Sequence, residues 1–307
     1  MRFTRKGQYA AREPLVLIGC GVGPMAGVVL HRRIIENTRT DGTDQDHLEV
    51  LHLSRSPLVG DRTDFLSGKD VLDPVAGMLQ VFRSAALILR AEDRRAVAGI
   101  PCNTFHAPAI FQPFLRSLHE EEVPVRVLSM LEEAADLVRR RHPGVKRVGL
   151  LSTTGTRTSG VYREVFGHRD LQLVEVPADM QDSLHEAIYH PQWGLKARSA
   201  AVPAVEEKVR RYLRTVIAGG AEVVILGCTE LPLAVREDLF EGVPLIDPMN
   251  ALARALVREA APKKLLTHPP PTGLPEQMPR RAPIAEHGST SVVSPANGAA
   301  SPLSTDR

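Results

Sequence analysis

The sequence contains few of the residues on which disulfide-stabilised and metal-binding folds depend. Only three of its 307 residues are cysteine, one is tryptophan, and the aromatic residues together make up 4%. So few cysteines, and an odd number of them, argue against a disulfide framework and favour a reducing compartment, so we expect a cytoplasmic protein. Neither a C-x-x-C pair nor a histidine-rich spacing is present, so we expect no metal site.

Charge of one sign and long apolar runs are also missing. The formal net charge is +2, which gives no electrostatic reason to expect nucleic acid or an anionic membrane as a partner. No apolar run reaches the roughly 18 residues that a membrane-spanning helix needs. The segment at residues 1–14 is basic, but the apolar core of a secretory signal does not follow it. We therefore expect no such signal, with a transit peptide as the weaker alternative.

What the sequence does contain is an alternation of apolar strands and amphipathic helices. Apolar runs too short for helices predict buried strands at residues 14–20, 48–53, 96–100, 124–128, 146–151, 171–176, 221–226 and 244–246. Apolar residues at helical spacing predict helices at residues 25–38, 73–91, 201–218 and 249–260. This order predicts an α/β fold with mostly parallel sheets flanked by helices.

The strand and helix pattern restarts near residue 146, which predicts two pseudo-symmetric domains with an active site in the cleft between them. We expect the first domain at residues 14–127, joined by a closing helix at 247–261, and the second at 128–246. Proline, serine, alanine and glycine dominate residues 262–307. That composition predicts a disordered tail.

Two cysteines occupy matching places in the two halves. One strand ends in Pro-Cys-Asn-Thr around Cys102, and another ends in Gly-Cys-Thr-Glu around Cys228. Open α/β sheets bind ligands at the carboxyl ends of their strands. A thiol there faces backbone N–H groups and the positive end of a helix, which predicts a lowered thiol pKa. A lone cysteine is often only a small buried apolar residue, and we interpret Cys20 in that way.

These two segments resemble the signature motifs of the cofactor-independent aspartate/glutamate racemase superfamily. The motifs are Cys102-Asn103-Thr104-x-His106 and Gly227-Cys228-Thr229-Glu230-Leu231. Further matches follow in order along the chain: a glycine turn at 21–24, an acidic segment at 44–47, an arginine loop at 57–63, an anion loop at 152–162 and a lysine segment at 188–196. The resemblance covers about residues 14–261 and is closest to the aspartate racemase branch.

The resemblance implies an amino-acid racemase that works as a homodimer without a cofactor, on aspartate, glutamate or a related amino acid. Cys102 and Cys228 would act as a pair from opposite faces of the substrate. One, as a thiolate, would remove the α-proton, and the other, as a thiol, would deliver a proton. Their roles would exchange in the reverse direction.

The resemblance also implies a set of substrate-binding residues. Hydrogen-bond donors would stabilise the charge that gathers on the α-carboxylate, and a cationic pair would bind a second carboxylate, the arginine through its bidentate fork. The set is Gly23, Arg62, Asn103, Thr104, Thr153, Thr154, Thr156, Lys196, Thr229 and Glu230. Helix capping is the alternative for the hydroxyl and amide side chains, and surface ion pairs are the alternative for the cations. His106 and Glu230 would tune the thiols or hold the loops, with a helix-surface role as the alternative.

Three departures from the family pattern surround the expected pocket. Phe105 stands beside Cys102 where a small residue is usual, and we expect it to narrow the pocket. Arg55 and Ser56 replace a more usual polar pair. An insert at residues 190–194 lengthens the segment before Lys196, which leaves the position of that lysine open.

Other functions remain as alternatives. The same superfamily includes hydantoin racemases, maleate isomerases and decarboxylases, but the arginine loop and lysine segment favour an amino-acid racemase. Gly21-x-Gly23-x-x-Ala26 loosely fits a dinucleotide fingerprint and would indicate a nicotinamide-dependent enzyme. However, the next strand ends in His52-Leu53, without the acid that binds the ribose. A non-catalytic relative is disfavoured because both cysteines are present.

Overall fold

Two sheets organise the part of the chain that the computed structural model describes, residues 13–20, 22–198 and 200–267. The first has the order β2-β1-β3-β4, and all its strands are parallel. The second has the order β6-β5-β7-β9-β8, with only β8 antiparallel. The strands are β1 (Leu15–Gly19), β2 (Val50–Leu53), β3 (Ala96–Gly99), β4 (Val125–Leu128), β5 (Arg147–Ser152), β6 (Gln172–Glu175), β7 (Val223–Gly227), β8 (Leu239–Phe240) and β9 (Val243–Ile246). The predicted α/β fold is confirmed.

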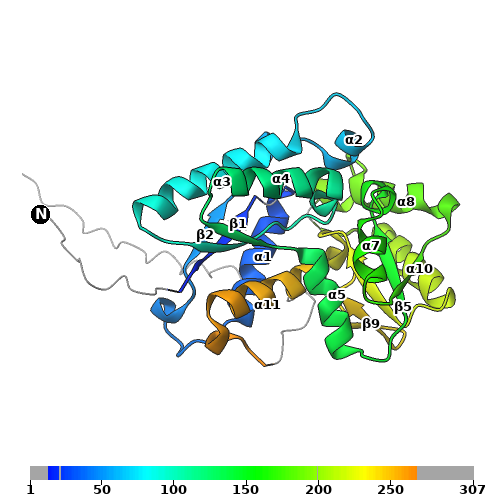
Figure 1. Cartoon of the computed structure of the whole chain (residues 1–307). Coiled ribbons are helices and arrows are strands. Elements are labelled where there is room, and N and C mark those ends of the chain that lie inside the picture. Colours follow the sequence, from blue (N-terminus) through cyan, green and yellow to red (C-terminus); the bar gives the residue numbers. More distant parts are fainter. Residues whose placement is uncertain (1–12, 21, 199, 268–307) are drawn as a thin grey trace, which may run out of the picture. The chain divides into compact units, whose positions relative to one another are not determined.

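Helices cover both faces of the first sheet, as Figure 1 shows. One face carries α3 (Pro74–Ala91) and α4 (Pro108–Glu120), and the other carries α1 (Pro24–Asn37) and α11 (Pro248–Ala260). Successive side chains of a strand point to opposite faces. Accordingly, Leu15 and Leu17 pack with α3 and α4, whereas Val16 and Ile18 pack with α1 and α11.

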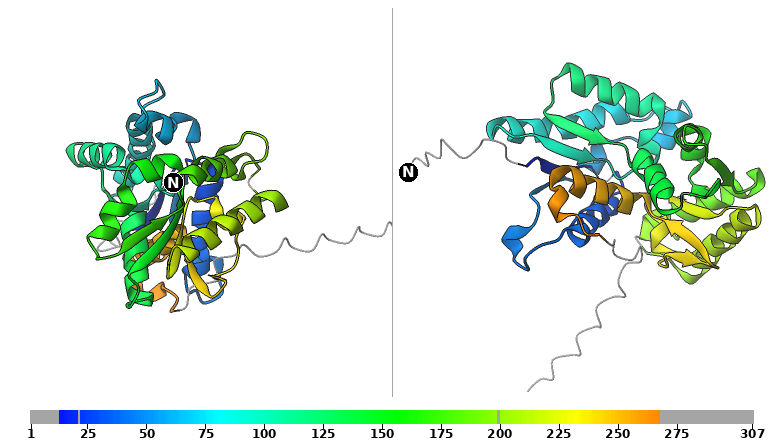
Figure 2. Two further views of the ribbon diagram at one scale, coloured as in Figure 1. Left: turned by 90° about the vertical axis from the view of Figure 1, so that its right-hand side faces the viewer. Right: turned by 60° about the horizontal axis from the view of Figure 1, so that its bottom comes forward.

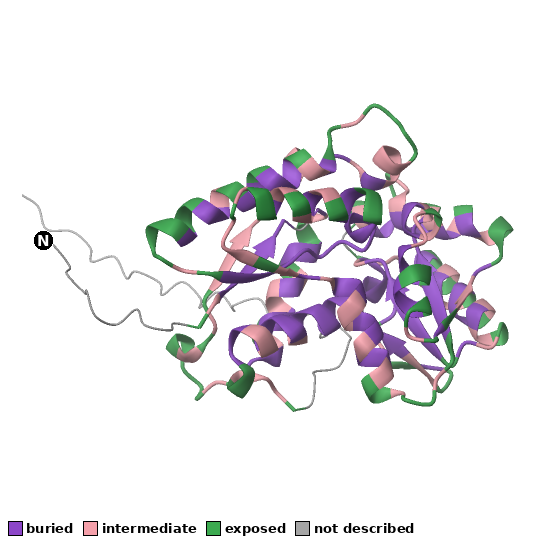
Figure 3. Cartoon of the chain, viewed as in Figure 1, coloured by how far each residue is buried: buried purple, intermediate pink, exposed green. Residues whose placement is uncertain are grey.

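The second sheet is enclosed in the same way. α8 (Ala178–Tyr189) and α10 (Pro203–Ala218) cover one face, and α5 (Met130–Arg141) and α7 (Val161–Gly167) pack with the other. One apolar core contains buried residues of both sheets, with α5 and α11 contributing to it. Figure 3 shows this core as buried strands and inner helix faces. The short helices α2 (Arg62–Leu66), α6 (Thr154–Thr158) and α9 (Leu195–Arg198) lie in loops.

Proline fixes the start of several helices. α1, α3, α4, α10 and α11 each have proline at one of their first two positions, where the missing N–H costs nothing because no intrahelical partner is available. α11 follows β9 in the chain but packs against α1 and β3 of the first sheet, as the views in Figure 2 also show. A Cβ at Gly99 of β3 would meet Leu252 of α11 at 2.9 Å, so the helix lies close on the strand.

The structure differs from the sequence prediction at the end of the described chain. We expected residues 262–307 to lack structure, but Pro262–Lys264 forms a 3₁₀ turn and Leu265 forms an antiparallel bridge with Thr38. The Leu266 N–H also donates to the Asn37 carbonyl at 3.0 Å. Backbone hydrogen bonds therefore hold residues 264–266, and the rest of the predicted tail, 268–307, lies outside the described residues.

The domain boundaries stay a prediction. In the described residues, no helix is both long and apolar enough to cross a membrane.

Candidate active site

Cys102 and Cys228 follow equivalent inner strands of the two sheets. Cys102 lies three residues after β3, which runs between β1 and β4, and Cys228 directly follows β7, which runs between β5 and β9. Their exposed fractions are 8% and 5%. None of the three cysteines, all in described residues, forms a disulfide. Both thiols are therefore at carboxyl ends of parallel strands, where ligands of such sheets bind.

The Cys228 thiol is held by a carboxylate. Its Sγ donates a hydrogen bond to Oε2 of Glu230 at 3.0 Å. Burial, and then the negative charge of Glu230, raise the pKa of Cys228 well above its ordinary value, although Lys196 acts in the opposite direction. Our prediction of a lowered thiol pKa is therefore wrong for Cys228, because burial and the neighbouring carboxylate outweigh the cation and the backbone N–H group.

The Glu230 carboxylate is enclosed by its neighbours. Oε2 also accepts a hydrogen bond from Oγ1 of Thr229 at 2.9 Å, and Oε1 lies 3.6 Å from Nζ of Lys196. A Cβ at Gly23 would lie 2.9 Å from Oε1, so the glycine leaves room for the carboxylate. Burial raises the pKa of Glu230, but Lys196, Cys228 and Thr229 together hold it below its ordinary value. Glu230 is therefore ionised.

Lys196 reaches the site despite the insert before it. Residues 191–193 form a turn, in which the Gly194 N–H donates to the His190 carbonyl at 2.9 Å. A Cβ at Gly194 would lie 2.5 Å from the His190 nitrogen, so only glycine fits this turn. α9 then places Nζ of Lys196 4.8 Å from the centre of the Tyr189 ring. Burial lowers the pKa of Lys196, but the charge of Glu230 and then Tyr189 outweigh burial, so the pKa lies above its ordinary value.

Arg62 is the cation beside Cys102. It is the first residue of α2, which Asp61 caps by accepting from the N–H groups of Thr63 and Asp64, and its exposed fraction is 6%. Burial lowers the pKa of Arg62, but attraction to Cys102 and then to Tyr189 and Asp61 raises it above its ordinary value. Its Nη1 donates to the Gly60 carbonyl at 3.0 Å. Arg62 is therefore a buried partner of a cysteine and not part of a surface ion pair.

The loop after Cys102 is bonded to the second sheet's helices. Oγ1 of Thr104 lies 2.8 Å from Oγ1 of Thr156 and 3.4 Å from that of Thr153. The Tyr162 hydroxyl donates to Oδ1 of Asn103 at 2.6 Å. Thr153 also caps α6, so the capping alternative holds for it. Four of the predicted site residues, Asn103, Thr104, Thr153 and Thr156, therefore link the two halves of the chain.

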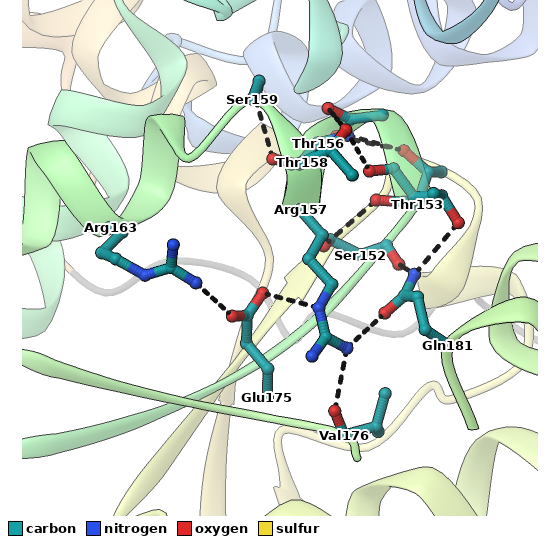
Figure 4. Close-up of polar contacts among 12 residues, drawn as sticks. Ser152, Thr153, Thr156, Arg157, Thr158, Ser159, Arg163, Glu175, Val176 and Gln181 are labelled. Carbon is teal, nitrogen blue, oxygen red and sulfur yellow. Dashed lines mark hydrogen bonds and ion pairs between the residues drawn. The ribbon is translucent and has the colours of Figure 1, made fainter. Parts of the chain in front are cut away.

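Side chains of neighbouring elements hold the anion loop in place, as Figure 4 shows. Gln181 donates to the Ser152 carbonyl at 3.0 Å, and Arg157 donates to Gln181 at 3.0 Å and lies 3.9 Å from Glu175. In the same loop, the Thr154 N–H donates to Nδ1 of His185 at 3.3 Å. These contacts fix the loop that carries the threonine hydroxyls.

His106 locks the Cys102 loop to the next helix. Its Nε2 accepts a hydrogen bond from the N–H of Met130, the first residue of α5, at 3.2 Å. Its Nδ1 therefore carries the proton and donates to the Cys102 carbonyl at 2.8 Å. Burial lowers the pKa of His106 to about 4. The imidazole is neutral at physiological pH and positions the loop.

Phe105 does not narrow the pocket as we predicted. The 3₁₀ turn Thr104–His106 directs its ring into the core beneath α4, where it is fully buried. It packs edge-on against Phe114, with the ring centres 5.4 Å apart. The large residue supports the loop from the core side, so its presence next to Cys102 says little about the substrate.

Sequence reasoning missed the roles of several residues around the cysteines. Tyr162 is the last residue of the anion loop at 152–162. Its hydrogen bond to Asn103 joins residues 59 positions apart, and no local pattern predicts it. The Tyr189 ring lies beneath the Lys196 ammonium, and burial raises the pKa of Tyr189 to about 12. His185 stacks on Tyr189 with ring centres 4.5 Å apart. A spacing of four residues on one helix is the signal that could have paired them.

We expect Tyr162→Phe to lower the free energy of unfolding by about 1–3 kcal/mol, because it leaves the buried Oδ1 of Asn103 without this donor. Tyr212→Phe is the matched control, since it removes a hydroxyl bonded to the partly exposed Ser183, which water can reach. Urea unfolding of both variants measures the difference. An equal loss in the two variants would contradict the importance of the Asn103 bond.

Comparison with known proteins places the chain in a family. The model of the Asp/Glu/hydantoin racemase family matches residues 20–256, more than half of the chain. A glutamate racemase of Carboxydothermus hydrogenoformans is 28% identical over 172 residues, which are 54% of this chain and 56% of that protein. The match to the next relative covers 64% of its length. The chain therefore aligns with less than two thirds of these relatives.

Solved structures share the fold. An aspartate racemase of Picrophilus torridus superposes with a TM-score of 0.64 at 24% identity, covering 83% of this chain and 96% of that one. An aspartate racemase homologue of Pyrococcus horikoshii superposes with a TM-score of 0.57, also at 24% identity, covering 81% and 99%. These likenesses concern the fold, and the family match confirms the resemblance seen in the motifs: the chain belongs to the Asp/Glu/hydantoin racemase family.

Proposed function

We propose that this protein racemises an amino acid without a cofactor by moving protons between two cysteines. The observation that carries the proposal is the placement of two buried thiols at matching strand ends, with a cation beside Cys102 and a carboxylate beside Cys228. In the forward direction, the Cys102 thiolate takes the α-proton and the Cys228 thiol gives its proton to the opposite face. The reverse direction exchanges the two roles.

The negative charge that develops on the α-carboxylate needs donors nearby. We assign this role to the amide of Asn103, whose oxygen already faces Tyr162, and to the hydroxyls and N–H groups of the anion loop. That loop carries Thr153, Thr154 and Thr156. Thr104 and Thr229 complete the group of hydroxyls around the cysteines.

The substrate has a second carboxylate in this proposal. Arg62 is buried and Lys196 is half-buried near the cysteines, and the Tyr189 ring contacts the lysine. Two cations on the side-chain end of the substrate favour aspartate, glutamate or a related dicarboxylic amino acid. We further propose a cytoplasmic homodimer, in keeping with three reduced cysteines.

The proposal predicts exchange of the substrate α-hydrogen with solvent. In D2O, without added cofactor, aspartate or glutamate should gain deuterium at Cα and lose optical purity at comparable rates. Proton NMR and chiral chromatography over a panel of the common amino acids measure both. No exchange with any of them would contradict an amino-acid racemase. Parallel incubations with a hydantoin, maleate and a substituted malonate test the other reactions of the superfamily.

A further inference from the structure

We propose that Glu230 is a positioning residue that holds the Cys228 thiol and keeps it protonated in the resting enzyme. This inference rests on the proposed function and goes beyond it. Of the roles that the motif left open for Glu230, it assigns the holding of one particular thiol, Cys228, and it assigns to Gly23 the space that Glu230 occupies. It also makes the two proton carriers unequal before any substrate binds.

The charges around the two sulfur atoms have opposite signs. A thiolate on Cys102 would face the Arg62 guanidinium, whereas a thiolate on Cys228 would lie 3.0 Å from a carboxylate oxygen. Like charges at this distance in a buried site repel strongly. The carboxylate of Glu230 therefore disfavours deprotonation of Cys228.

The carboxylate is fixed where it acts on the sulfur. Oε2 accepts from both Thr229 and Cys228, and Oε1 faces Lys196. Gly23 leaves room for Oε1 because it has no side chain. A Cβ at this position would lie only 2.9 Å from that oxygen. The hydrogen bonds and the ion pair of the Glu230 carboxylate are thus made with Cys228, Thr229 and Lys196.

Proton balance gives the consequence for turnover. When Cys102 takes the α-proton and Cys228 gives up its own, the enzyme is left with a Cys102 thiol and a Cys228 thiolate beside Glu230. The proton must return from Cys102 to Cys228, through solvent or by the reverse reaction, before the same enantiomer is used again. The two free forms of the enzyme are unequally populated, and the less stable one contains the stronger base.

Alkylation of the thiols tests the assignment without any substrate. Iodoacetamide modification from pH 6 to 10, resolved for each cysteine by peptide mass spectrometry, should reach Cys228 only toward the alkaline end of this range in the native protein. In Glu230→Gln the pH of half-maximal reaction at Cys228 should fall by at least one unit. In Lys196→Met it should rise, because the cation that favours the Cys228 thiolate is gone.

Glu121→Gln is the matched control, since it removes one carboxylate from a surface ion pair with Arg83. It should leave the reaction at Cys228 unchanged. An unchanged half-point in Glu230→Gln, or a shift of the same sign in Lys196→Met, would overturn the inference. Because these measurements need no turnover, they can fail while racemisation is observed, or succeed while no racemisation is found.

A kinetic measurement adds a readout that a purely structural role would not change. In Glu230→Gln, the pH profiles of kcat for the two enantiomers should both move to lower pH by a similar amount, and Glu230→Asp should restore part of the native profile. A loss of activity without any shift in the profiles would assign Glu230 to folding alone.

Discussion

Replacement of either site cysteine by serine is expected to lower racemisation by roughly 10³-fold in both directions, because a positioned acid or base contributes on the order of 10²–10⁴-fold. A serine hydroxyl is too weak an acid to replace the thiol, and each direction of the reaction uses both sulfurs. Chiral assays of Cys102→Ser and Cys228→Ser with the substrate found in the exchange panel measure the effect.

The third cysteine provides the control for these variants. Cys20 is buried near the first strand and packs in the same core as Cys102, but no step of the proposed reaction uses it. Cys20→Ser should retain activity to within about tenfold. Full activity in Cys102→Ser or Cys228→Ser would remove that residue from the mechanism, and loss of activity in Cys20→Ser alone would point to a different thiol.

The second large effect concerns stability in acid. His106 has a pKa of about 4 in the folded protein and an ordinary pKa near 6.5 when the chain is unfolded. As the pH falls below about 6.5, the unfolded chain binds a proton that folded His106 does not. The free energy of unfolding should therefore fall by roughly 3 kcal/mol between about pH 6.5 and pH 4, and no further below that.

Urea unfolding at half-unit steps from pH 7.5 to pH 4 measures this effect, with His106→Gln as the comparison. The variant is expected to be less stable at neutral pH, because glutamine fits the Cys102 carbonyl and the Met130 N–H less well. Its stability should nevertheless depend less on pH by the same amount. Identical pH dependence in the two proteins would show that folding does not lower the pKa of His106.

Much of the fold could be predicted because the strands are buried on both faces. β1, β3 and β7 read as uninterrupted apolar runs, as buried parallel strands do. α5 was missed because charged residues occupy half of its sequence, and its apolar face is apparent only against the core. The turn at residues 191–193, which brings Lys196 to the site, depends on a glycine contact that no local pattern shows.

The chemistry of the site was less predictable than its location. The matched strand ends locate both cysteines, since parallel strands bring their carboxyl ends to one edge. The pKa of Cys228 depends on which side chain fills the space beside it, and that is decided by Gly23, more than 200 residues earlier in the chain. Phe105 shows the same difficulty, because a 3₁₀ turn and not the residue type directs its ring into the core.

The position of α11 has a consequence for how the protein is made. The helix is formed by residues 248–260, yet it covers one face of the sheet formed by residues 15–128, with Leu252 and Leu256 against Gly99. During synthesis the first sheet therefore leaves the ribosome with α1 as the helix on that face and without the cover that α11 gives. It can complete its core only after the second sheet has also been translated. Chaperones that bind apolar surface have the longest access to this half of the nascent chain.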